Sequence, residues 1–170
     1  MTNWLAGMET TADRLYSTDL IGKLVFFATR DTNQSISNTT SANIDATNAL
    51  SWETISLDRL GGWVSGSPTL YTCTYAGWYE LSGGIGFNSN ATGSRTSGWM
   101  VNGSTPAGGH GPRLNANATT THFQVASSLP VLLAVGDYVR LVPGQSSGAA
   151  LNTATGGPRP FISIKYVGES

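Results

Sequence analysis

The sequence has few of the features on which disulfide bonding, membrane insertion and export depend. Its single cysteine, Cys73, excludes an internal disulfide, and no neighbouring charge stabilises a thiolate, so we interpret it as a small buried residue. No segment approaches the roughly 20 apolar residues of a membrane-spanning helix. The N-terminus also lacks the basic-then-apolar order of a signal peptide. We therefore expect a protein made in a cytoplasm, with no membrane partner.

Charge is also scarce in this chain. Charged residues make up 11% of the sequence, against roughly 25% in ordinary soluble domains. The nine lysines and arginines are scattered singly and the net charge is −1, which excludes the basic patch that nucleic-acid binding requires. Five tryptophans, six tyrosines and five phenylalanines rule out a disordered composition. A surface of Ser, Thr, Asn and Gly is typical of secreted or virion β proteins.

Motifs for catalysis and metal binding are missing from the sequence. It contains no nucleophile elbow, no P-loop and no dinucleotide-binding glycine pattern. His110 and His122 have no neighbouring carboxylate or cysteine, so a metal site would need copies of one histidine around a symmetry axis. Glu80 and Asp58 would be the carboxylates of a glycosidase, but no pattern places them roughly 5 to 9 Å apart. We expect no enzyme, no cofactor and no metal.

The pattern of short apolar runs and turn residues predicts an all-β fold. About eight to ten short strands at regular spacing, without a long helix, indicate an antiparallel sandwich or barrel. Composition does not separate a jelly roll from an immunoglobulin-type sandwich. The expected strands are residues 21–30, 49–58, 69–75, 75–87, 95–103, one or two within 119–135, 136–144 closed by Pro143 and Gly144, and 160–168.

The segment YAGWYELSGGIGF, residues 75–87, combines aromatic residues with closely spaced glycines. Gly83, Gly84 and Gly86 would each cost a helix interior about 1 kcal/mol relative to alanine, so the segment is predicted to be a strand. Glycine within a strand marks a bulge or the close approach of another backbone. The approaching element would be another subunit or the facing sheet, unless the glycines only bend the strand.

Residues 1–20 differ from the rest of the chain and are predicted to form a short N-terminal arm, with the domain covering 21–170. Thr10 or Thr11 would cap a short helix. Such a helix is marginal alone in water. The arm must therefore dock on the body of the protein or on a partner, and the residues predicted to anchor it are Trp4, Leu5, Met8, Arg14 and Leu15.

The order of the later motifs resembles the jelly-roll domain of the tumour necrosis factor and complement C1q superfamily. A Gly-aromatic-Tyr strand (77–79) is followed by an Asn-Gly turn (102–103), a Gly-Asp-x-Val strand (136–139) and a final Phe-led strand from Phe161. The resemblance covers residues 69–168, with 21–68 supplying the first strands. It implies a homotrimer built around aromatic and small residues. The residues it places at the trimer interface or in the core are Tyr79, Gly83, Gly84, Gly86, Phe87 and Phe161.

The N-terminal pattern W-x-x-G-x-x-x-T-A-x-R-L resembles small structural proteins of tailed phages of Gram-positive, high-GC bacteria. Together the two resemblances imply a trimeric virion protein whose partners are itself and the major capsid protein or another virion protein. We favour a capsid decoration or head-fibre role, because the chain has no long fibrous shaft. The alternative is a minor tail or tail-tip protein that binds host cell-wall carbohydrate. Tryptophans available to contact such a glycan are Trp63, Trp78 and Trp99, although burial in the core is the stronger interpretation.

Overall fold

The computed structural model describes residues 19–116 and 120–169, and these residues form β-strands joined by turns and two short 3₁₀ helices. The strands are β1 (Leu24–Thr29), β2 (Ser35–Ile36), β3 (Thr54–Asp58), β4 (Tyr71–Thr72), β5 (Gly77–Phe87), β6 (Ser94–Val101), β7 (Leu114–Asn115), β8 (His122–Leu133), β9 (Tyr138–Gln145), β10 (Leu151–Asn152) and β11 (Phe161–Gly168), and the helices are η1 (Thr40–Ala42) and η2 (Ala46–Asn48). Within these ranges, no helix is long and apolar enough to cross a membrane.

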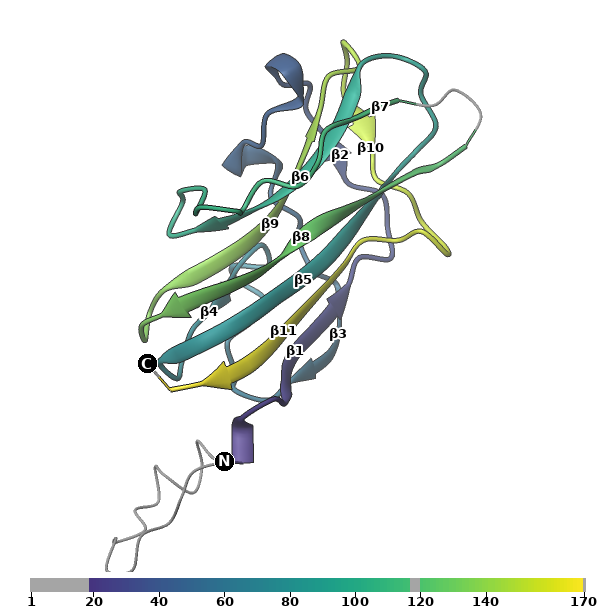
Figure 1. The fold of residues 1–170 in the computed structure, drawn as a ribbon. Coiled ribbons are helices and arrows are strands. Elements are labelled where there is room, and N and C mark those ends of the chain that lie inside the picture. The colour runs from purple at the N-terminus through teal and green to yellow at the C-terminus, as the bar shows by residue number, and fades with distance from the viewer. Residues whose placement is uncertain (1–18, 117–119, 170) are drawn as a thin grey trace, which may run out of the picture.

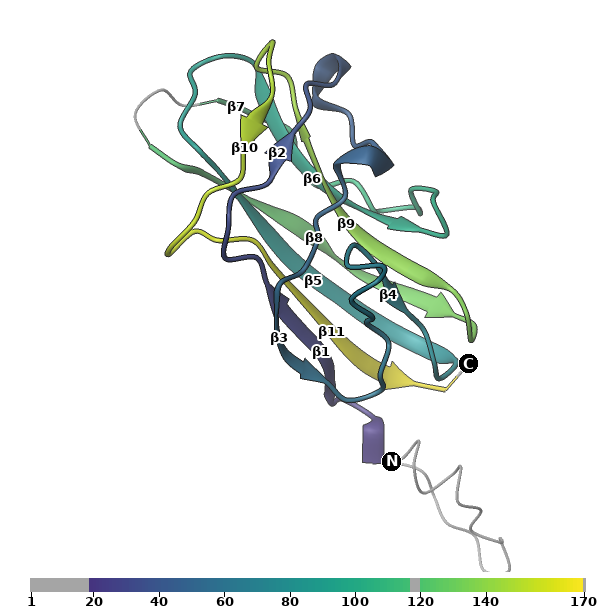
Figure 2. The ribbon, with the colours of Figure 1, turned by 180° about the vertical axis from the view of Figure 1, so that it is seen from behind.

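The strands form two main antiparallel sheets that face one another (Figure 1). A five-stranded sheet has the order β3-β1-β11-β5-β8, and a four-stranded sheet has the order β4-β9-β6-β7. A two-stranded sheet, β10-β2, lies at the end of the molecule opposite the start of β1 (Figure 2). The predicted antiparallel sandwich is therefore confirmed.

The core between the sheets follows from alternation along the strands. In β5, Tyr79, Leu81, Ile85 and Phe87 are fully buried, because every second side chain of a strand points to the same face. Trp99 of the facing sheet is also fully buried, and its indole Nε1 donates a hydrogen bond of 2.7 Å to the Ser127 carbonyl of β8. This bond satisfies the polar atom of the largest buried side chain and ties the two sheets together.

Two strand predictions need correction. Pro143 and Gly144 do not close the strand they belong to: β9 continues through both residues, which pair with Ser97 and Thr96 of β6. Proline is tolerated there because β4, on the other side of β9, pairs only with Tyr138 and Val139. The predicted strand 69–75 is reduced to β4. The segment 119–135 holds a single strand, which agrees with the one or two predicted there.

The outward face of the four-stranded sheet is covered by the chain itself. The segment around η1 and η2 lies against it, so that Ile44 and Ala46 pack on Met100 and Val142. The contact is close: a Cβ added to Gly144 would lie 2.3 Å from the Ala42 carbonyl oxygen. Because Gly144 has no side chain, the backbone of the covering segment can lie directly against the backbone of β9.

The described part of the chain begins at the edge of this core. Leu20 is 1% exposed and belongs to the core cluster, and the Gly22 amide donates to the Tyr166 carbonyl of β11 at 2.8 Å. Leu20 is thus part of the domain. The predicted arm residues Trp4, Leu5, Met8, Arg14 and Leu15 lie outside the described residues.

Candidate assembly face

The outward face of the five-stranded sheet carries three aromatic side chains and a valine, called here the aromatic patch: Phe27, Phe123, Val125 and Phe161. The Phe161 ring lies 6.4 Å from the Phe27 ring and 6.4 Å from the Phe123 ring, and it stacks on Phe123 with an interplanar angle of 8°. Val125 beside them is 58% exposed. Gly84 forms the floor, since a Cβ there would lie 2.4 Å from Phe123 Cζ. The patch is therefore an apolar surface preorganised by ring stacking.

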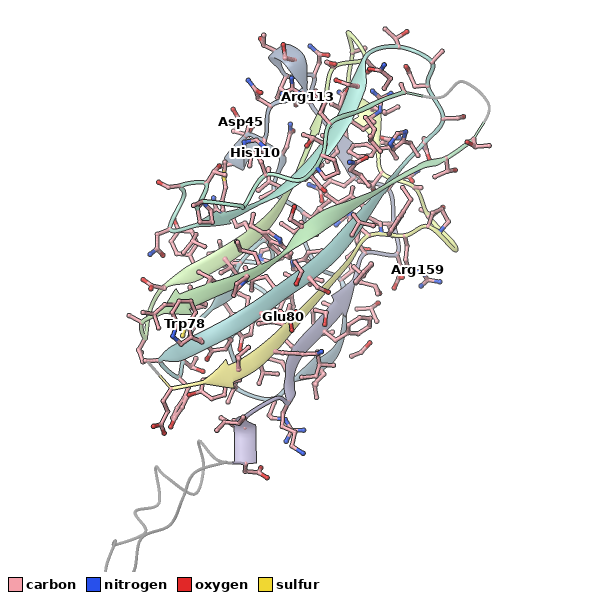
Figure 3. All side chains as sticks on the ribbon, in the orientation of Figure 1. Asp45, Trp78, Glu80, His110, Arg113 and Arg159 are labelled. Carbon is pink, nitrogen blue, oxygen red and sulfur yellow. The ribbon has the colours of Figure 1, made fainter. Side chains whose placement is uncertain are left out.

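A second apolar group, the lower apolar patch, lies at the other end of the same face and consists of Trp78, Leu132 and Val167. Trp78 and Leu132 are paired across β5 and β8, and each of the three side chains is more than 40% exposed. Trp78 lies near the end of the sheet at which β1 begins (Figure 3). Large apolar side chains gathered on one face in this way mark an interaction surface.

A polar belt separates the two apolar patches and consists of Glu80, Ser82, Ser128, Ser163 and Lys165. Glu80 stands opposite Lys165, and Ser82 opposite Ser163, in the register of β5 and β11. Ser128 of β8 donates a hydrogen bond of 3.0 Å to Glu80 Oε1. A hollow of about 90 Å³ lies between the Glu80, Ser82, Ser163 and Lys165 side chains. The outward face is thus apolar at both ends and polar in the middle.

The other glycines of β5 have different neighbours within the chain. A Cβ on Gly83 would point into the core, 2.8 Å from Leu141 Cδ2 and 3.2 Å from the Trp99 ring, so the facing sheet is the close neighbour there. A Cβ on Gly86 would point outward, 1.9 Å from the Pro158 carbonyl oxygen. A loop of the same chain therefore covers Gly86, and neither position is open to another subunit.

The structure divides the residues predicted for the interface or core between the two faces of the sheet. Tyr79 and Phe87 are fully buried in the core. Phe161 and Gly84 lie on the outward face, within the aromatic patch. The prediction did not include Phe123 or Val125, although their alternation with buried neighbours in HFQVA is the sequence signal for an apolar outward face.

The three tryptophans predicted for glycan contact are also in different places. Trp99 is fully buried, so that prediction is wrong for this residue, because its ring fills the core between the sheets. Trp63 is half-buried and packs on the core, and its Nε1 donates to the Pro68 carbonyl at 3.3 Å. Trp78, which is 43% exposed, is the member of the three whose ring is open.

A buried tyrosine cluster surrounds the single cysteine. The Cys73 Sγ lies 3.7 Å from the Tyr79 hydroxyl, and Tyr79 donates a hydrogen bond to the Tyr75 carbonyl. The Tyr166 ring meets the rings of Tyr75 and Tyr79 edge to face. Burial raises the pKa of Cys73 and of Tyr79, and it raises the pKa of Tyr166 to about 12. These groups stay protonated at neutral pH, so the thiol is a core residue and not a nucleophile.

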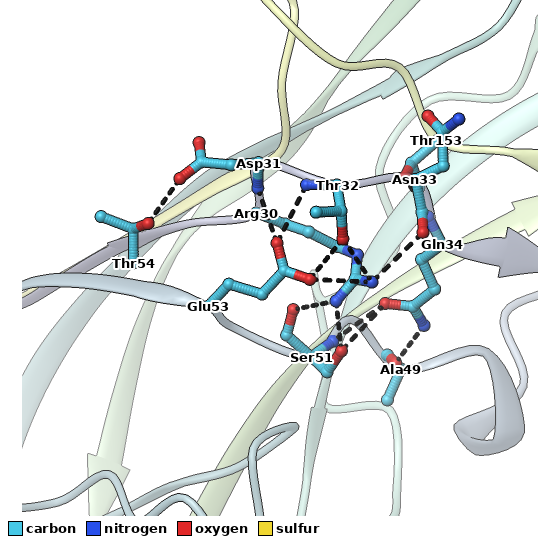
Figure 4. A network of polar contacts seen from close by, with 10 residues as sticks. All are labelled: Arg30, Asp31, Thr32, Asn33, Gln34, Ala49, Ser51, Glu53, Thr54 and Thr153. Atoms are coloured by element: carbon cyan, nitrogen blue, oxygen red, sulfur yellow. Dashed lines mark hydrogen bonds and ion pairs between the residues drawn. The ribbon is translucent and has the colours of Figure 1, made fainter.

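A polar network ties the segment after β1 to the segment before β3 (Figure 4). Arg30 Nη2 lies 3.1 Å from Glu53 Oε1, and Arg30 Nη1 donates to the Ser51 carbonyl at 2.9 Å. The Thr32 amide donates to Glu53 Oε2 at 2.9 Å. Burial alone would raise the pKa of Glu53, but hydrogen bonds from Thr32 and the charge of Arg30 lower it overall. Because the chain itself fills these positions, we interpret the network as structural.

Asp58, one of the two carboxylates considered for chemistry, is likewise used by a turn. Asp58 accepts hydrogen bonds of 3.0 Å from the amides of Gly62 and Trp63. Asp58 also lies on β3, three strand spacings from Glu80 on β5, which corresponds to roughly 14 Å. That separation exceeds the distance a glycosidase pair needs. Among the described residues, no three His, Cys, Asp or Glu side chains come together as a metal site would require.

Asp137 holds the turn between β8 and β9. Its carboxylate accepts hydrogen bonds of 2.8 Å from the Ala134 amide and the Asn102 side chain. These bonds lower the pKa of Asp137, the Ala134 amide contributing most. Asn102 and Gly103 have φ angles of 50° and 80°, which is the positive-φ pair that a tight Asn-Gly hairpin needs.

Comparison with solved structures identifies the architecture. The chain is similar to murine APRIL (TM-score 0.54, 13% identity, covering 84% of this chain and 98% of that one). It is also similar to Eiger TNF from S. frugiperda (0.58, 8% identity, 86% and 94%) and to the globular domain of zebrafish complement 1qA (0.50, 10% identity, 83% and 100%). The fold is that of the tumour necrosis factor and C1q-like jelly rolls. No protein-family model and no curated protein matches the sequence.

Proposed function

We propose that this protein is a non-enzymatic structural component of a phage virion, a homotrimer that decorates the capsid and is anchored by its N-terminal arm. The observation that carries the assembly is the outward face of the five-stranded sheet. Its apolar patches are exposed, whereas the outward face of the four-stranded sheet is covered by Ile44 and Ala46. A jelly roll with one bare sheet suits packing of that sheet against copies of itself, which is what the family resemblance implies.

The virion role rests on the N-terminal pattern and on the end of the sandwich at which β1 begins. Residues 19 and 169 lie at the same end of the sandwich, while the turn-rich segments around η1 and β7 lie at the other end (Figure 1). An arm that leaves from one end and docks on a shell would leave the opposite loops pointing outward. Three arms in one trimer would bind together, and multivalency would raise a modest affinity per arm.

The second candidate function is binding of host cell-wall carbohydrate by a tail-tip protein. The exposed ring of Trp78 favours it, because sugars stack on open aromatic rings. However, Trp78 lies on the face proposed for assembly and close to the end where the arm begins (Figure 3), and Trp99 is buried. The decoration role therefore has more support. Binding to an array of cell-wall glycans that Trp78→Ala abolishes would favour the second candidate.

The decisive experiment separates the arm from the domain. Deletion of residues 1–18 should leave a folded, soluble trimer by light scattering that no longer joins virions, and Trp4→Ala should reduce virion incorporation in part. The matched deletion of 1–20 also removes Leu20, a buried leucine worth roughly 2–3 kcal/mol, and should lower the unfolding free energy as well. Normal virion occupancy by the 1–18 deletion would place the anchor elsewhere. A monomeric wild-type protein at micromolar concentration would contradict the trimer.

A further inference from the structure

We propose that the polar belt determines how the copies align: Glu80 of one copy pairs with Lys165 of the next, and not with Lys165 of its own chain. This inference rests on the proposed homotrimer and adds the residues that select the register of its subunits. Its basis is the arrangement of charges on the outward face, which the chain itself leaves unpaired.

Glu80 and Lys165 are direct cross-strand neighbours on β5 and β11. Opposite charges in such positions are close enough to pair within a sheet. Yet the ion pairs among the described residues are Arg30–Glu53 and Arg159–Asp31, and none joins Glu80 to Lys165. Both charges are therefore available to groups outside the chain.

The carboxylate of Glu80 is directed toward the edge of the sheet. Its Oε1 accepts the hydrogen bond from Ser128, which belongs to β8, and β8 is the last strand of the five-stranded sheet. The hollow of about 90 Å³ opens between Glu80 and Lys165 and is lined by Ser82 and Ser163. An ammonium group arriving from a neighbouring copy would find a carboxylate and serine hydroxyls as acceptors there.

The number of charged residues on this face also fits a ring around the threefold axis in which Glu80 of one copy alternates with Lys165 of the next. The five strands of this sheet contain only three Asp, Glu, Lys or Arg residues, namely Asp58, Glu80 and Lys165. The Asp58 carboxylate is bound by the turn after β3, which leaves Glu80 and Lys165. Burial of a charge without a partner is strongly unfavourable. Around a threefold axis, residue i of each copy meets residue j of the next. One acid and one base per copy then leave no charge unpaired.

Crosslinking tests whether the two positions meet between copies. Chains carrying Glu80→Cys and chains carrying Lys165→Cys, with different tags, are assembled together and treated with a short bis-maleimide. We expect a crosslinked pair containing one chain of each kind, whereas Glu80→Cys mixed with Arg113→Cys should give none. The native Cys73 is 1% exposed and should not react. Mixed trimers without the mixed crosslink would overturn the pairing.

Charge reversal tests whether the pairing selects the register. Glu80→Lys should abolish the trimer at concentrations where the wild type is trimeric, and adding Lys165→Glu to that variant should restore it. Arg113→Glu, on the β6–β7 segment, makes an equal change of charge and should leave the trimer intact. If Glu80→Lys is poorly folded by circular dichroism, Glu80→Gln should weaken trimer association at least tenfold. Unchanged association of a folded variant would overturn the inference, and a monomeric wild type would instead overturn the proposed function.

Discussion

The two sheets of this jelly roll differ in what covers their outward faces. On the four-stranded sheet, Met100 and Val142 lie beneath Ile44 and Ala46, so a segment of the same chain covers the apolar side chains of the outward face. On the five-stranded sheet, Phe123, Val125 and Leu132 remain exposed. The same polypeptide thus finishes one face by itself and leaves the other apolar, and this asymmetry is the physical reason to expect a partner on one side only.

Glycine has a different role on each face. Gly144 gives a backbone segment room to lie on the four-stranded sheet, where the Ala42 carbonyl is its neighbour. Gly84 gives the rings of Phe123 and Phe161 room to lie flat on the five-stranded sheet. Substitution at the first position should therefore damage the fold, and substitution at the second should damage the surface.

The largest effect is expected from Gly144→Val. Its Cβ would lie 2.3 Å from the Ala42 carbonyl oxygen and 2.7 Å from Thr96 Cγ2, and backbone cannot move aside as a side chain can. We expect the free energy of unfolding to fall by about 3 kcal/mol. Gly157→Val, at a glycine with nothing within 4 Å of its added Cβ, should stay within about 0.5 kcal/mol of wild type. Urea unfolding of both variants measures the difference, and equal stabilities would show that the covering segment is loose.

The second-largest effect is expected on trimer assembly, when a charge is placed on the exposed outward face of the five-stranded sheet. Val125→Glu puts a carboxylate among the stacked rings of the aromatic patch and should convert the trimer to a folded monomer in light scattering. Val64→Glu is the matched control, because Val64 is as exposed as Val125 (57% and 58%) but lies in the loop after β3. A trimer that survives Val125→Glu and dissociates with Val64→Glu would move the interface away from the five-stranded sheet.

A smaller change in assembly is expected from Gly84→Val. The added side chain would displace the end of the Phe123 ring, which is a movable group, so the fold should lose only about 1 kcal/mol. The displaced ring no longer stacks on Phe161, and association should weaken while remaining measurable. Sedimentation across a dilution series gives the association constant. A Gly84→Val protein that associates as tightly as wild type would exclude the aromatic patch from the interface.

The sequence predicted the strands more successfully than it predicted what the faces contact. Alternation and the Asn-Gly and Gly-Asp turns are local signals, so β5, β6 and the turn at Asp137 could be placed from neighbouring residues alone. The role of Gly86 depends on Pro158, some seventy positions later, and no local pattern reports such a contact. Pro143 was misplaced for the same reason, because whether a proline ends a strand depends on which neighbour stands beside it.

Raising the pH tests the burial of the tyrosine cluster and should lower the stability of the fold moderately. Burial raises the pKa of Tyr79 above its ordinary value, and raises that of Tyr166 to about 12, against about 10 in the unfolded chain. The unfolded state therefore releases these tyrosine protons first, and the stability contributed by the two tyrosines, fully present below pH 10, falls as the pH rises toward 12. Cys73 acts in the same direction, starting from its ordinary value of 9.0. Melting temperatures between pH 8 and 12 measure this decline, and a flat profile would contradict the burial of these groups.

The smallest effect is expected from Tyr166→Phe, compared with Tyr79→Phe in the same cluster. Among the described residues, the buried Tyr166 hydroxyl has no hydrogen-bond partner, whereas the Tyr79 hydroxyl donates to the Tyr75 carbonyl. Removing an unpaired buried hydroxyl while keeping its ring contacts should change the unfolding free energy by less than about 0.5 kcal/mol, and removing the paired one should cost about 1 kcal/mol. Tyr166→Phe should also make the decline above pH 10 shallower, because one raised pKa is gone. If Tyr166→Phe costs as much as Tyr79→Phe at neutral pH, the Tyr166 hydroxyl makes a hydrogen bond and the expected difference between the two tyrosines is wrong.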